Sequence, residues 1–168
     1  GYVLEGAKCV VLGGDSADKL IVSARVSGDR ASKDGLALFL VDANAPGVTR
    51  KGYPTQDGTR AADVTLSGVK VGADGVIGEA GKAYPVIERT VQNGIAYLAA
   101  EAVGGMNALH ELTVEYLKTR KQFGVPIGSF QVLQHRSVDM FVSVEQAKSM
   151  ALYACVMIDE PDESERRR

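Results

Sequence analysis

The sequence has 168 residues and a formal net charge of −2, with 45% hydrophobic and 24% charged residues. This composition is ordinary for a globular protein, and the net charge gives no electrostatic reason to expect nucleic acid as a partner. No segment approaches the roughly 18 apolar residues that a membrane span requires. The length allows one domain of usual size or two small ones.

The first residues, Gly1-Tyr2-Val3-Leu4, resemble a strand, and they contain neither an initiator Met nor the pattern of a signal peptide. We therefore expect the chain to be a piece of a longer protein. Cys9 and Cys155 lie far apart in apolar contexts, which predicts two buried, reduced thiols in a cytoplasmic protein. No Cys/His spacing of the kind that binds a metal is present.

The first part of the chain, to about residue 80, consists of short runs rich in β-branched and apolar residues, separated by Gly and Asp clusters. Such spacing predicts an antiparallel sandwich or barrel. Pro46-Gly47 predicts a turn, and Gly52 predicts a bulge. The predicted strands are 7–12, 19–26, 36–41, 48–52, 62–66 and 69–71.

The hydrophobic period changes to three or four residues from about residue 82. The pattern predicts a helix that continues to Thr119, is roughly 55 Å long and has Pro85 in its first turn. Gly104-Gly105 within it would suit the close crossing of another helix. The apolar stripe consists of Ile87, Val91, Ile95, Leu98, Ala102, Met106, Leu109, Thr113 and Tyr116.

A second helix is predicted from Ser129, as N-cap, to about Ile158. A helical pair of this length cannot bury its apolar surface on a small sheet. We expect it to pack on further helices, either outside this piece or from other subunits.

The stretch between the two helices concentrates two Arg, three Gln, one His and two Phe around a tight Gly/Pro turn. A helical hairpin needs only the turn, so this surplus of polar and aromatic groups points to a ligand or partner. The stretch is Arg120-Lys121-Gln122-Phe123-Gly124-Val125-Pro126-Ile127-Gly128-Ser129-Phe130-Gln131-Val132-Leu133-Gln134-His135-Arg136.

This stretch, with Asp139-Met140 after it, closely resembles the signature of the FAD-dependent acyl-CoA dehydrogenases. Residues 1–8, 22–25, 38–41, 45–48 and 99–106 also match. A narrower similarity, to the small subunits of pimeloyl-CoA dehydrogenases, rests on residues 10–14 and 116–120. The resemblance implies a multidomain α+β piece. Residues 1–80 would be the middle β domain without its N-terminal part, and residues 81–168 the first two helices of a four-helix bundle.

The resemblance also implies a reaction, α,β-dehydrogenation of an acyl-CoA with hydride transfer to FAD. An electron-transferring flavoprotein would reoxidise the flavin, and the assembly would be a homo- or hetero-tetramer. The cofactor-binding residues implied, which would contact the FAD of a neighbouring subunit, are Arg120, Gln122, Phe123, Phe130 and Gln131.

The chemistry of these side chains suits that role. Arg supplies a fixed fork of donors for a pyrophosphate, Gln supplies donor and acceptor for a purine or ribose edge, and Phe supplies an apolar wall for adenine. The alternative is that Arg120 and Gln131 merely cap and tie the helical hairpin. His135 is expected to hydrogen-bond within the bundle, and His110 to be structural.

Three departures from the family limit what the resemblance implies. The flavin-facing strand carries Val10 and Leu12 where the family has an aromatic residue and a hydroxyl. Gln92 and Ile95 replace an acidic residue and an Arg near the acyl-CoA, and Gly94 stands where one branch places its catalytic Glu. We therefore assign no catalytic residue and expect the base beyond residue 168. Glu88-Arg89 is interpreted as an exposed pair.

Two functions remain open. The chain belongs either to a catalytic acyl-CoA dehydrogenase subunit or to a non-catalytic small subunit that completes the FAD site of a partner. This piece alone is expected to be inactive.

Overall fold

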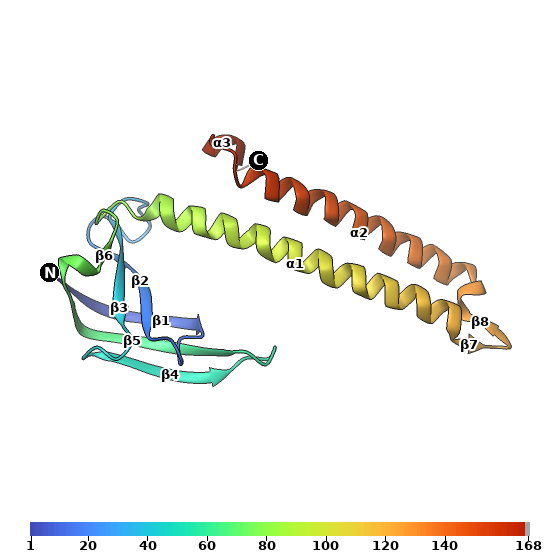
Figure 1. The fold of residues 1–168 in the computed structure, drawn as a ribbon, viewed down its shortest axis with the longest axis horizontal. Coiled ribbons are helices and arrows are strands. Elements are labelled where there is room, and N and C mark those ends of the chain that lie inside the picture. Colours follow the sequence, from blue (N-terminus) through green and yellow to red (C-terminus); the bar gives the residue numbers. More distant parts are fainter. Residues whose placement is uncertain (167–168) are drawn as a thin grey trace. The chain divides into compact units, whose positions relative to one another are not determined.

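A computed structural model describes residues 1–166 of the protein. The chain divides into two compact units, Gly1–Ile87 and Glu88–Arg168. The first unit contains antiparallel strands and the second a pair of long helices (Figure 1). Within residues 1–166, no helix combines the length and apolar character needed to cross a membrane.

Two three-stranded antiparallel sheets form the β unit, in the orders β1-β5-β4 and β2-β3-β6 (Figure 1). This architecture confirms the antiparallel β prediction. The predicted runs 62–66 and 69–71 belong to one strand, β5. The strands are β1 (Tyr2–Leu12), β2 (Lys19–Arg25), β3 (Leu36–Asp42), β4 (Val48–Pro54), β5 (Arg60–Val71) and the short β6 (Val76–Ile77), which follows the 3-10 turn Ala73–Gly75.

The two sheets share one hydrophobic core. In each sheet, side chains from one face of the strands β1, β2, β3 and β5 are buried in this core. Phe39 on β3 is fully buried, and its ring makes an edge-to-face contact with the ring of Tyr2, with centroids 5.0 Å apart. The core therefore joins the first strand of one sheet to the central strand of the other.

The expected bulge at Gly52 is wrong, because Gly52 pairs in regular register with Ala62. Glycine is needed there for a different reason: a Cβ would come within 2.8 Å of the Cβ of Asp15. The irregularities lie instead between β1 and β5. The turn at Pro46-Gly47 is confirmed, since the Val48 amide donates to the Ala45 carbonyl at 3.0 Å.

The helical unit is an antiparallel hairpin, with α1 and α2 side by side and a short two-stranded ribbon at their junction (Figure 1). Its elements are α1 (Tyr84–Thr119), β7 (Lys121–Gln122), β8 (Val125–Pro126), the 3-10 turn Ile127–Ser129, α2 (Gln131–Met157) and α3 (Glu163–Arg166). The helix that ends at Thr119 is confirmed, and Pro85 lies in its first turn.

The predicted N-cap of the second helix is wrong. Ser129 lies in the preceding 3-10 turn, and its hydroxyl donates to the Pro126 carbonyl at 2.7 Å. The helix begins at Gln131, and its N-cap residue, Phe130, makes no side-chain capping bond. The nearby carbonyl engages the hydroxyl that would otherwise cap the helix.

Much of the apolar surface of the helical unit stays uncovered within residues 1–166. Val91, Ile95, Leu98, Leu109 and Tyr116 of the predicted α1 stripe are all exposed. The buried contacts use small or medium side chains instead, Ala96, Val144 and Ala151. Apart from the backbone of α1 itself, no atom within residues 1–166 lies within 4 Å of a Cβ built on Gly104 or Gly105, so α2 is not the closely crossing helix expected there.

Three smaller expectations also need correction. Cys9 and Cys155 are free thiols, but both are exposed rather than buried. Glu88 and Arg89 are half-buried rather than an exposed pair, and the Arg89 guanidinium lies 3.9 Å from the Asp159 carboxylate. A local apolar context did not fix burial at either Cys because its strand or helix also has an outward face.

Replacement of Phe39 by Ala should destabilise the β unit by about 3–5 kcal/mol, because it leaves a cavity between the two sheets. The neighbouring Leu40 is 43% exposed, so Leu40→Ala is the control and should change stability by less than about 1 kcal/mol. Urea unfolding followed by circular dichroism measures both. Equal midpoints for the two variants would contradict this description of the core.

Candidate functional site

The loop between the long helices holds an aromatic residue in a strained backbone conformation. Residues Phe123 and Gly124 connect β7 to β8, and both have positive φ, 54° and 82°, as type I′ hairpin loops require. Asn or Gly usually occupies the first position. A bulky residue there costs on the order of 1–3 kcal/mol. Phe123 is nevertheless 91% exposed.

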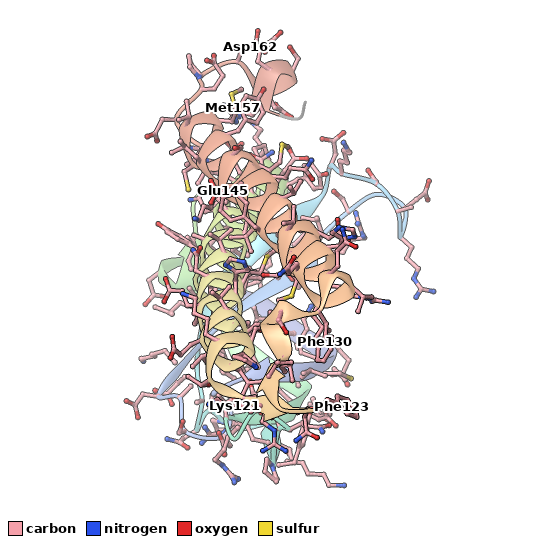
Figure 2. The ribbon with its side chains drawn as sticks, turned by 90° about the vertical axis from the view of Figure 1, so that its right-hand side faces the viewer. Lys121, Phe123, Phe130, Glu145, Met157 and Asp162 are labelled. Carbon is pink, nitrogen blue, oxygen red and sulfur yellow. The ribbon has the colours of Figure 1, made fainter. Side chains whose placement is uncertain are left out.

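The β7–β8 ribbon lies beyond the ends of both long helices (Figure 1), and Figure 2 labels Lys121, Phe123 and Phe130 at this end of the hairpin. The ring of Phe123 meets that of Phe130 edge-on, with centroids 6.1 Å apart. Such a pair contributes about 0.5–1.5 kcal/mol, which is comparable with the lower end of the cost of the strain. An exposed aromatic ring held in this way is suited to contact a molecule outside the chain.

The loop is anchored by its backbone and by Gln134, a residue for which the sequence predicted no individual role. The carbonyl of Arg120 accepts the Ile127 amide at 2.8 Å. The side-chain amide of Gln134 donates to the Gly128 carbonyl at 2.8 Å. A Cβ on Gly128 would lie 2.8 Å from the Leu117 carbonyl oxygen, so the turn passes directly against the end of α1. The position of Gln134 in the first turn of α2 is the sequence feature that could have predicted this anchoring role.

The predicted cofactor-binding residues lie together around this loop and are available for a ligand. Arg120, Gln122 and Gln131 are exposed. Within residues 1–166, their side chains make no hydrogen bond or ion pair. In the described structure, neither the Arg120 side chain nor the Gln131 side chain ties the hairpin, although the Arg120 backbone does. One guanidinium, two amides and two aromatic rings without polar partners fit the diphosphate and adenine of a dinucleotide.

A second strained residue, Val10, lies in β1. Its φ is 54°. A β-branched side chain avoids this region. Two residues, Cys9 and Val10, stand opposite the single residue Asp63 of β5, which makes a bulge. The Val10 amide donates to Oδ1 of Asp63 at 3.3 Å.

The same carboxylate oxygen of Asp63 accepts the hydroxyl of Tyr53, on β4, at 3.2 Å. Partial desolvation, as the larger cause, and this hydrogen bond, as the second cause, raise the pKa of Tyr53 above its usual value. Val10 and Leu12 are both exposed on β1. They are the positions that the family resemblance places against the flavin. Their side chains offer apolar contact but neither a ring nor a hydroxyl.

The positions expected near the acyl-CoA lie on α1. Gln92 and Ile95 line a cavity of about 380 Å³ with residues of α2, including Tyr153 and Met157. A Cβ on Gly94 would meet no atom within 4 Å. No acidic residue among the described residues 1–166 lines this cavity. Within residues 1–166, no group of three or more His, Cys, Asp or Glu residues could hold a metal ion.

Comparison with known proteins gives one family. A family model described as "Acyl-CoA dehydrogenase, middle domain" matches residues 1–70, and one described as "Acyl-CoA dehydrogenase, C-terminal domain" matches residues 82–167. The chain is 32% identical over 161 residues to "Probable acyl-CoA dehydrogenase YngJ" of Bacillus subtilis (strain 168). That match covers 94% of the chain and 42% of the relative.

Solved structures agree with this assignment. The "FAD complex of PigA" has a TM-score of 0.90 at 29% identity and covers 98% of this chain and 44% of that one. Butyryl-CoA dehydrogenase from Megasphaera elsdenii has a TM-score of 0.81 at 30% identity and covers 92% of this chain and 41% of that one. The comparisons thus define a class, proteins with the dehydrogenase middle and C-terminal domains. The chain belongs to the acyl-CoA dehydrogenase family and spans about two fifths of the length of these relatives.

A change of Gly128 to Ala should destabilise the loop and the start of α2. The added methyl group would overlap the Leu117 carbonyl, and relief of that overlap is expected to cost about 1–3 kcal/mol. Gly94→Ala is the matched control. It adds a methyl group into open space in a helix interior and should stabilise by about 0.5–1 kcal/mol. Thermal unfolding followed by circular dichroism separates them, and a Gly128 variant as stable as the parent would contradict the close approach.

Proposed function

We propose that the chain is part of a flavoprotein acyl-CoA dehydrogenase, which removes hydrogen from the α and β carbons of an acyl-CoA. Family membership supports this reaction, as do the names of relatives such as the short-chain-specific acyl-CoA dehydrogenase of Megasphaera elsdenii. The observation that carries the proposal is the set of unpartnered donors around the strained, exposed ring of Phe123.

In this proposal Arg120, Gln122, Phe123, Phe130 and Gln131 hold the FAD of a neighbouring subunit. Arg120 pairs with the diphosphate, the two glutamines contact ribose or adenine edges, and the phenylalanines form an apolar wall. The bound flavin would accept the hydride from the β carbon. This chain's contribution is to bind and orient the cofactor, while the catalytic base lies beyond residue 168.

The partners proposed for the whole protein are an acyl-CoA, an electron-transferring flavoprotein and further subunits of a homo- or hetero-tetramer. Residues 1–80 would form part of the middle domain and residues 81–168 the first two bundle helices, in a cytoplasmic protein. One solved structure that resembles this chain is described as an electron transferring flavoprotein of Acidaminococcus fermentans.

The second candidate is a non-catalytic small subunit that completes the FAD site of a partner. Its support is specific. Val10 and Leu12 present only apolar groups where the flavin is expected, and Gly94 has no side chain where one branch of the family places its base. The loop residues, by contrast, are all present.

The 168-residue chain alone should neither retain FAD tightly nor oxidise an acyl-CoA. It carries donors for one end of the cofactor, while the uncovered α1 stripe leaves the helical unit without its packing partners. Absorbance of the purified chain in the visible range, together with an assay using butyryl-CoA and an artificial electron acceptor, checks this. A yellow sample that turns over the substrate would contradict it.

In the full-length protein with its partner, Arg120→Ala or Gln131→Ala should weaken FAD binding. A bidentate Arg–phosphate contact at a subunit boundary is expected to contribute on the order of 2–4 kcal/mol. This corresponds to roughly one to three orders of magnitude in dissociation constant, at ~1.4 kcal/mol per decade. Fluorescence titration of the apoprotein with FAD measures the change.

Two lysine variants are the controls. Lys19→Ala removes an exposed ion pair with Asp42 on the β unit, and Lys148→Ala removes one with Glu145 on α2. Both remove a positive charge away from the loop and should leave FAD affinity within about twofold, since surface pairs contribute little. If the Arg120 and Gln131 variants bind FAD like these controls in an intact complex, the loop is structural.

A further inference from the structure

The strand pair β1–β5 contains two bulges, and the same kind of hydrogen bond stabilises both. In each, a carboxylate from one strand accepts the amide of the positive-φ residue on the other. Glu5 accepts the Gly68 amide at 2.8 Å, and Gly68 has φ 65°. Asp63 accepts the Val10 amide at 3.3 Å, and Val10 has φ 54°.

The difference between the bulges lies in the residue that adopts the left-handed backbone. Glycine enters this region without a steric penalty, whereas a β-branched residue does not. The bulge at Gly68 is therefore relaxed, and the bulge at Val10 is strained. A bulge needed only to bend the sheet could use glycine at both places. Strain that persists at one of two equivalent positions indicates that its side chain is required there.

The carboxylate at the Val10 bulge also bonds a third strand, whereas the Glu5 carboxylate at the other bulge accepts the hydroxyl of Ser67, on β5 itself, at 3.5 Å. Oδ1 of Asp63 receives the Tyr53 hydroxyl from the opposite side at 3.2 Å. The carboxylate thus links β1 to β4 across the outer face of the central strand β5. Within residues 1–166, Val10 and Phe123 are the only non-glycine residues with positive φ. Phe123 is the tip of the loop already proposed to contact FAD.

We propose that Asp63 is a positioning residue that holds Val10 in its left-handed conformation, so that Val10 and Leu12 form a preset apolar face for the flavin ring. Both side chains are exposed, at 59% and 75%, and an apolar face of this kind would contact the ring without a hydrogen bond from a side chain. Tyr53 fixes the Asp63 carboxylate in turn. This inference rests on the proposed FAD function.

The test uses the full-length protein with its partner. FAD affinity is measured by fluorescence titration, and the visible absorption spectrum of the bound flavin is recorded. Asp63→Ala should weaken FAD binding on the order of tenfold, the loss expected when one such bond no longer orders the contact face, and should alter the flavin band. Asp63→Asn keeps an oxygen acceptor for both donors and should retain parental behaviour.

Two further variants separate positioning from general stability. Val10→Gly removes the strain, so the bulge no longer needs Asp63. In that background Asp63→Ala should cause a loss of less than about threefold. Glu5→Ala breaks the equivalent bond at the relaxed bulge and should change neither affinity nor spectrum.

The inference is overturned if Asp63→Ala binds FAD with parental affinity and spectrum. It is also overturned if Glu5→Ala causes the same loss, or if the Asp63→Ala loss is undiminished in the Val10→Gly background. A parent complex that binds no FAD would instead overturn the proposed function itself, and this inference with it. Retention by the parent, with loss in the Arg120→Ala, Gln131→Ala and Asp63→Ala variants but not in Asp63→Asn or Glu5→Ala, supports both.

Discussion

Backbone strain at two residues determines which apolar side chains this chain exposes to a ligand. Val10 and Phe123 adopt a left-handed conformation that their side chains disfavour, and each is held there by neighbours rather than by its own preference. The Asp63 carboxylate holds Val10. The paired strands β7 and β8 and the ring of Phe130 hold Phe123. In both cases the stability of the surrounding unit offsets the strain, and the result is an apolar side chain exposed to solvent in a fixed position.

The sequence predicted those parts of the fold that depend on local pattern. The change of hydrophobic period, Pro85 in the first turn of α1 and the turn before Val48 are all read from short segments. The predictions from sequence were wrong where a tertiary contact decides which local conformation a residue adopts. Gly52 is required by the nearby Asp15, not by a bulge. The hydroxyl of Ser129 donates to the Pro126 carbonyl instead of capping the helix. The strain at Val10 depends on a strand more than fifty residues away along the chain, so no local pattern could reveal it.

The candidate site shows the same division. The residue types that suit a dinucleotide were evident from their concentration in one loop, because the chemistry of Arg, Gln and Phe does not depend on knowing the fold. The sequence did not show that the side chains of Arg120 and Gln131 make no hydrogen bond within residues 1–166. That absence follows from the anchoring of the loop by Gln134 and by backbone bonds, which leaves the side chains of Arg120 and Gln131 unused. A residue that merely tied the hairpin would have its donors occupied.

Under the proposed assignment, the two strained positions also explain how one chain can keep some features of its family and lack others. The loop residues would contact the cofactor of a neighbouring subunit, whereas β1 would face the cofactor of its own. These are different FAD molecules, so a change at Val10 or Leu12 does not weaken the contacts that Arg120 makes. A subunit can then supply a complete loop to its partner while its own strand offers only apolar contact. In that case unlike subunits divide the two tasks: this chain helps to retain the cofactor, and its partner carries out the flavin chemistry.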